Sequence, residues 1–170
     1  MIKILGAILL VGVTTWMGLN ASLRLRRRET TARDFASALE QLAAMMSCEL
    51  LPMPDALERL SDSAPETTRS FFKMCLHGMK ELGDRPFSQI WKQSLECCGA
   101  WLGGQERAVL VRAGQILGRY GLEAQLSAIG GSVHRLRSLA DSSAAEVKEK
   151  GRVYTALGVC SGVMAVIVLI

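Results

Sequence analysis

The pattern of apolar and charged positions divides the chain into three parts. The stretches Ile4 to Leu23 and Val153 to Ile170 carry no Asp, Glu, Lys or Arg, whereas every such residue except Lys3 lies between them. As helices, the two stretches would be about 30 Å and about 27 Å long, and a bilayer has a hydrocarbon core of about 30 Å. We therefore predict a transmembrane helix over 1–23, a helical domain over 24–152 and a second transmembrane helix over 153–170.

Basic residues gather at the inner flanks of both stretches and predict the topology. They are Arg24, Arg26, Arg27 and Arg28 after the first stretch, and Lys148, Lys150 and Arg152 before the second. The positive-inside rule places the central domain in the cytoplasm and both termini outside. A cleaved signal peptide, with a weak site at Leu19-Asn20-Ala21, is the competing interpretation. It is opposed by the arginine cluster and by an apolar run longer than the usual h-region of about 7–15 residues.

Within the central segment, apolar residues recur at helical spacing and prolines interrupt them. A helix is predicted from the box Thr31 to Asp34, with its apolar face ending at Leu50 and a break at Leu51-Pro52. Its predicted core positions are Phe35, Leu39, Leu42, Met46 and Leu50. Pro54 suits the first turn of a short second helix, and Ser63 to Glu66 has the pattern of a capping box that opens a third.

Two further helices and one long one complete the prediction. The fourth begins at Pro86 and contains Ile90, Trp91 and Leu95, and the fifth ends near Gly118 to Gly121. A seam in steps of four and three then follows along Leu122, Leu126, Ile129, Val133, Leu136 and Ala140. No proline follows Pro86, so this last helix can continue into the second span. The central domain is predicted to be all-α, a bundle of about six helices.

Composition excludes several classes of function. The net charge of +4 is small, and no aromatic residues alternate with basic ones, so nucleic acid is not an expected partner. The five cysteines include no C-x-x-C, which is typical of free thiols in a reducing compartment. Neither His77 nor His134 has a second ligand at metal-binding spacing. We expect no metal and no cofactor, and we predict a protein that is not an enzyme; a Cys98–His134 nucleophile pair is the enzymatic alternative.

Two kinds of site remain as candidates for interaction. Gly158 and Gly162 form a G-x-x-x-G in the second predicted span, which allows close helix packing in membranes, although glycine is also common there without such a role. Asp55 and Arg119 stand at the two turns, Pro52 to Pro54 and Gly118 to Gly121. Loops on rigid helices often carry binding residues, so both are candidate partner contacts; the alternative is that these turns only reverse the chain.

Four stretches along the chain resemble the stage III sporulation protein AB family. They are Leu5-Gly6 with Thr14-Thr15-Trp16-Met17-Gly18, Leu51-Pro52-Met53-Pro54-Asp55-Ala56-Leu57, Leu117-Gly118-Arg119-Tyr120-Gly121 with Gln125, and Tyr154-Thr155-Ala156-Leu157-Gly158-Val159. The resemblance covers nearly the whole chain in order. The sequence departs from the family pattern at Gly121, where the family usually has Asp, and at Met46-Ser47-Cys48. The surface that contacts a partner can therefore differ from that of the family at these residues.

The resemblance implies a location and a role. It implies an inner-membrane subunit of the channel complex between mother cell and forespore, with its domain in the mother-cell cytoplasm and similar to the type II secretion F proteins. The expected partners are a cytoplasmic ATPase, other channel subunits and the lipid bilayer, with a homo-oligomer left open. The expected role is an assembly platform; a membrane-tethered adaptor or regulator unrelated to secretion is the alternative.

Overall fold

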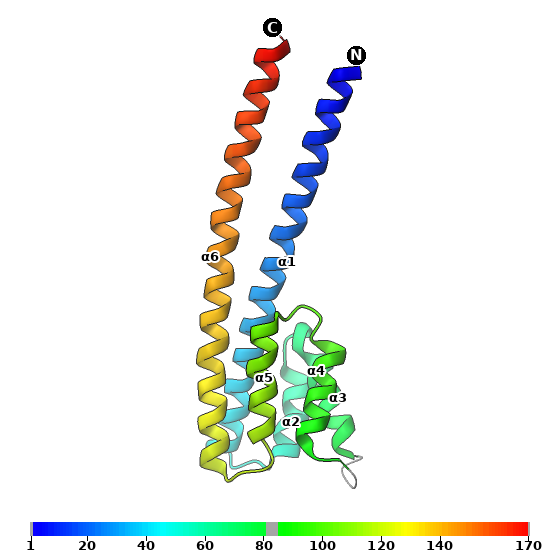
Figure 1. The fold of residues 1–170 in the computed structure, drawn as a ribbon. Coiled ribbons are helices and arrows are strands. Elements are labelled where there is room, and N and C mark those ends of the chain that lie inside the picture. The colour runs from blue at the N-terminus through cyan, green and yellow to red at the C-terminus, as the bar shows by residue number, and fades with distance from the viewer. Residues whose placement is uncertain (1, 81–84, 170) are drawn as a thin grey trace. The chain divides into compact units, whose positions relative to one another are not determined.

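The computed structural model describes the backbone of residues 2–80 and 85–169, and the side chains of residues 23–80 and 85–146. This described part is all-helical, with six helices and no strand, which confirms the prediction of an all-α fold (Figure 1). The helices are α1 (Ile2–Ser47), α2 (Met53–Ser63), α3 (Glu66–Lys80), α4 (Phe87–Cys98), α5 (Gly104–Ile116) and α6 (Leu122–Leu169). The chain forms two units. One is the compact domain, Arg28–Asp141, and the other contains the rest of α1 and α6.

Two helices are far longer than the others, α1 with 46 residues and α6 with 48. The predicted helix start at Thr31 is wrong, because Thr31 lies inside α1 and is only 4% exposed. No Gly or Pro occurs between Leu19 and Ser47, so nothing in the sequence interrupts the helix there. The prediction that the last helix continues past the domain is confirmed, since α6 passes Gly130-Gly131 and Gly151 unbroken.

The ends of the first two helices differ from the prediction. α1 ends at Ser47, and Leu50 then takes a positive φ of 52° with 75% of its surface exposed, so its assignment to the core is wrong. The Leu51 N–H donates a hydrogen bond to the Met45 carbonyl at 3.2 Å. Ser63 is the last residue of α2, and its hydroxyl donates to the Arg59 carbonyl at 3.0 Å. It therefore ends one helix, whereas the sequence predicted that it caps the next.

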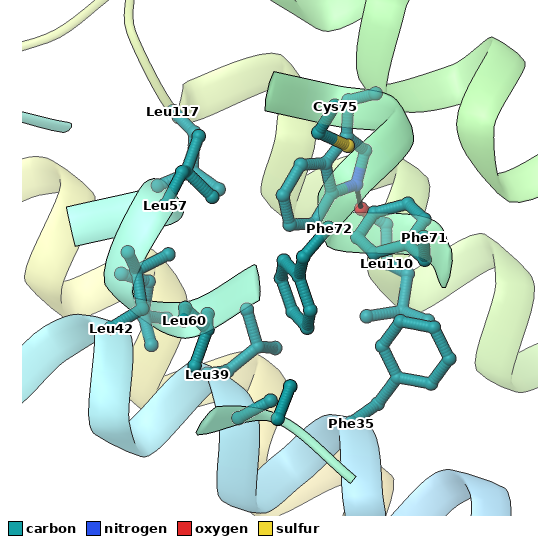
Figure 2. Packing of buried hydrophobic residues seen from close by; sticks show 14 of the residues in the cluster. Phe35, Leu39, Leu42, Leu57, Leu60, Phe71, Phe72, Cys75, Leu110 and Leu117 are labelled. Atoms are coloured by element: carbon teal, nitrogen blue, oxygen red, sulfur yellow. Dashed lines mark hydrogen bonds between the residues drawn. The ribbon is translucent and has the colours of Figure 1, made fainter. Parts of the chain in front are cut away.

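The core of the compact domain is built from aromatic and aliphatic side chains of all six helices. Figure 2 shows Phe35, Leu39 and Leu42 of α1 facing the side chains of α2 and α3. The Phe71 ring lies edge-on to Phe35 with ring centroids 5.2 Å apart, and edge-on to Trp91 at 4.7 Å. Such edge-to-face pairs add about 0.5–1.5 kcal/mol each beyond the burial of their area. α1, α3 and α4 thus meet at one aromatic cluster.

Trp91 fixes α4 on α5. Its indole N–H donates to the Leu110 carbonyl at 2.8 Å, and the side chain is fully buried. Gly114 lies directly beneath the ring, where a Cβ would come within 2.1 Å of Trp91 Cδ1. A side chain at position 114 would therefore displace the tryptophan and break its hydrogen bond, because the ring is enclosed and cannot yield.

The seam along α6 is confirmed in its middle and wrong at its start. Ile129, Val133, Leu136 and Ala140 are all buried. Leu126 is only partly buried against the core, and Leu122 is 41% exposed. The periodic pattern is correct, but the first turn of α6 extends beyond the core that it packs against.

One ion pair joins α1 to the start of α5. The Arg28 guanidinium donates two hydrogen bonds to the Glu106 carboxylate, Nε to Oε1 at 2.7 Å and Nη2 to Oε2 at 2.9 Å. The Glu106 side chain is fully buried and that of Arg28 is 32% exposed. Gly103 allows this contact, since a Cβ there would lie 2.5 Å from the guanidinium atoms. Arg28, predicted only as a topology residue, therefore also holds the fold together.

The buried positions of α6 predict a graded series of stabilities. Ile129→Asp places a charge in the core and should cost several kcal/mol, close to the whole stability of an ordinary domain. Leu126→Asp should cost less, and Leu122→Asp should stay within about 0.5 kcal/mol because its side chain reaches solvent. Urea unfolding of residues 24–152, followed by circular dichroism, measures the series. Equal midpoints for Ile129→Asp and Leu122→Asp would show that the seam is misassigned.

The ion pair predicts that removing one of its two charges lowers the stability of the protein more than removing both. Arg28→Met leaves a fully buried carboxylate without a counter-charge and should destabilise the protein by about 3–5 kcal/mol. The double variant Arg28→Met/Glu106→Leu removes both charges and should recover most of that loss.

Arg33→Met is the matched control. The Arg33 side chain is 49% exposed and pairs with an exposed Asp141, so its loss should cost at most about 1 kcal/mol. A double variant as unstable as Arg28→Met, measured by the same urea unfolding, would show that the buried charge is not what matters.

Candidate functional site

The described residues contain little that points to catalysis. No three His, Cys, Asp or Glu side chains among them are grouped as metal ligands. Burial raises the pKa of the Cys98 thiol, and the neighbouring Cys97 raises it further. Burial also raises the pKa of Cys75, to about 12. A nucleophilic cysteine needs a lowered pKa, so neither thiol is activated at neutral pH, and the proposed pairing of Cys98 with the exposed His134 gains no support.

The two predicted contact residues, Asp55 and Arg119, are exposed at the same end of the compact domain. Successive helices alternate in direction, so the α1–α2 turn, the first turn of α4 and the α5–α6 turn come together there (Figure 1). We call this region, residues 48–55, 86–89 and 117–122, the turn end. Two of the exposed large apolar side chains at the turn end, Leu50 and Tyr120, are 75% and 54% exposed. The turn end therefore combines exposed charge with exposed apolar surface.

An open groove of about 440 Å³ lies at the turn end beside Arg119. Its lining residues are Ser88, Arg112, Gln115, Ile116, Arg119 and Tyr120. They come from the start of α4, the last two turns of α5 and the α5–α6 turn. We call it the α5 groove. Asp55 is not among its lining residues; it stands in the first turn of α2, where a negative charge stabilises the helix N-terminus.

Of the residues that line the α5 groove, only Arg119 could be identified from the sequence. Arg119 was predicted from its turn, but Arg112 and Ser88 were not. Arg112 lies on α5 and Arg119 lies in the turn after it, so no helical spacing in the sequence links the two residues. Ser88 could not have been added, because it reaches the groove from another helix.

The remaining predicted sites lie partly or wholly outside the described side chains. Arg24, Arg26 and Arg27 are exposed on α1. Outside the described side chains are residues 1–22 of the first predicted span, the whole second span with Gly158 and Gly162, and the residues Lys148, Lys150 and Arg152. Within the described residues, no helix has an apolar stretch long enough to cross a bilayer.

Comparison with known proteins gives one consistent result. The family model of stage III sporulation protein AB matches residues 3–170. A stage III sporulation protein AB of Bacillus subtilis (strain 168) is 25% identical over 174 residues, which is 99% of each chain. A solved structure of a stage III sporulation protein AB covers 72% of this chain and 97% of its own, with a TM-score of 0.64 and 19% identity, and so shows the same fold. Because the family model matches residues 3–170, this chain belongs to the stage III sporulation protein AB family.

Proposed function

We propose that this sporulation protein is a membrane-anchored, non-enzymatic assembly platform that engages a cytoplasmic ATPase on behalf of a channel complex. The observation that carries the proposal is the charge pattern around two apolar ends, in a chain that belongs to a sporulation family. Basic residues at the inner flanks would keep the compact domain in the mother-cell cytoplasm. The lipid bilayer and other channel subunits would then be its partners along the predicted spans.

The long helices support a mechanical role. α1 and α6 each continue without a break from core positions, such as Phe35 and Ile129, into the apolar ends of the chain. A continuous helix is stiffer than a loop, because each backbone group is hydrogen-bonded to the next turn. A force applied to the domain would then act on the predicted spans through the backbone of these two helices.

The turn end is the surface that we assign to the ATPase. It presents Asp55 and Arg119 on turns between rigid helices, together with exposed Leu50 and Tyr120. Mixed polar and apolar surface with an exposed aromatic and arginine is typical of protein interfaces. The raised pKa of Cys98 favours a non-enzymatic role over the thiol hydrolase considered from the sequence.

Charge reversal at the turn end tests the proposal. Asp55→Lys and Arg119→Glu should reduce co-purification of the cytoplasmic ATPase. Arg119→Glu should leave the free energy of unfolding within about 0.5 kcal/mol, because the residue is exposed. Asp55→Lys should cost about 1 kcal/mol, because it puts a positive charge at the N-terminus of α2. Arg135→Glu, an exposed change on α6, is the control and should leave capture intact. An alanine scan of both turns with unchanged ATPase capture and sporulation would place the interface elsewhere. A wild-type protein that binds no ATPase of its host would remove the coupling role.

A further inference from the structure

The arginines of the compact domain differ in their partners, and Arg107 donates to the Gly99 carbonyl at 2.9 Å. Five form ion pairs with carboxylates: Arg28, Arg33, Arg59, Arg69 and Arg137. The guanidinium groups of Arg112 and Arg119, like those of Arg85 and Arg135, have no ion pair or hydrogen bond with any described residue. Only Arg112 and Arg119 among these four line the α5 groove. Two positive charges therefore lie on one concave surface without a counter-charge from the part of the domain that the structure describes.

The rest of the groove is suited to a polypeptide. Ile116 and the exposed Tyr120 supply apolar surface near the two arginines, and Gln115 and Ser88 add an amide and a hydroxyl that can both donate and accept. A peptide segment presents this mixture, with carboxylates, an apolar side chain and backbone amides in one run. Arginine also binds carboxylates with two parallel hydrogen bonds, which fixes orientation as well as charge.

Other anionic surfaces fit less well. Anionic membranes are bound through clusters of about four to eight basic residues. Nucleic acids are bound by neutralising phosphates along a track. Two arginines beside an isoleucine and a tyrosine make neither a polybasic patch nor a track.

We propose that the α5 groove binds an acidic segment of a partner protein, with two carboxylates paired to Arg112 and Arg119 and an apolar side chain on Ile116 and Tyr120. This inference rests on the proposed function in taking the protein to be a platform for other proteins. It goes further in naming the chemistry of the bound segment and in adding Arg112, Gln115 and Ser88 to the contact surface. It predicts that the partner's binding segment is rich in Asp or Glu.

The test uses the full chain, purified in detergent, and a short fluorescein-labelled peptide with Glu residues on both sides of a Leu. Fluorescence anisotropy should show saturable binding that weakens as salt is raised. Arg112→Glu/Arg119→Glu should weaken binding at least about tenfold, because two charge-assisted pairs are lost. Arg135→Glu changes the net charge outside the groove and should alter the affinity less than about twofold.

A charge exchange makes the test independent of folding. The same peptide with Lys in place of Glu should bind the Arg112→Glu/Arg119→Glu variant more tightly than it binds the wild-type chain, which requires a folded groove. If the variant recovers no binding with the Lys peptide, or if Arg135→Glu weakens the Glu peptide as much as the double change does, the proposal is wrong. In those cases the two arginines only stabilise the negative C-terminal end of α5 or add to the overall positive charge of the domain.

A lipid or phosphate ligand is separated by competition. Glycerophosphoglycerol, the headgroup of an anionic lipid, should not displace the peptide at comparable concentration. Displacement would assign the α5 groove to a small anion and overturn the proposal. The peptide assay contains no ATPase, so a negative result would leave the proposed platform role unchanged. If the peptide binds but the protein captures no ATPase, the α5 groove keeps its proposed ligand and only the proposed ATPase partner is ruled out.

Discussion

The arrangement of the compact domain depends on the buried ion pair between Arg28 and Glu106. It is the point where α1 enters the compact unit, and it brings the first turn of α5 against a helix that is distant in sequence. A fully buried carboxylate is costly unless its oxygens are matched, and the two short hydrogen bonds from one guanidinium match both. Such a pair contributes geometry more than net stability, because the desolvation of its charges offsets much of their attraction. Together with the buried Phe35, Leu39 and Leu42, it positions α1 on the domain.

The aromatic cluster supplies the stability that the ion pair does not. Phe35, Phe71 and Trp91 come from three helices and meet edge to face, and Gly114 lets the indole lie against α5. These contacts specify which helix lies next to which. The turns that join them then fall at alternate ends, which is why Asp55 and Arg119 share one end although they are far apart in sequence.

The sequence predicted features that depend on local periodicity. The buried faces containing Phe35, Leu39 and Ile129 followed from helical spacing, and prolines correctly separated the short helices. It failed where the outcome depends on distant partners. Arg28 and Glu106 are 78 positions apart, and no local pattern links them. Leu50 and Leu122 obey the apolar period but lie beyond the reach of the core. The α5 groove needs Ser88 from another helix, so only Arg119 could be proposed as part of it.

The functional account depends on which side of a membrane each part of the chain occupies. Single cysteines at positions 1, 62 and 170, in a chain whose native cysteines are replaced, measure this directly with a membrane-impermeant maleimide; Asp62 is an exposed residue of α2. The account predicts that positions 1 and 170 are labelled in intact cells and that position 62 is labelled only after the membrane is opened. Labelling at position 62 in intact cells, with both ends protected, would contradict it.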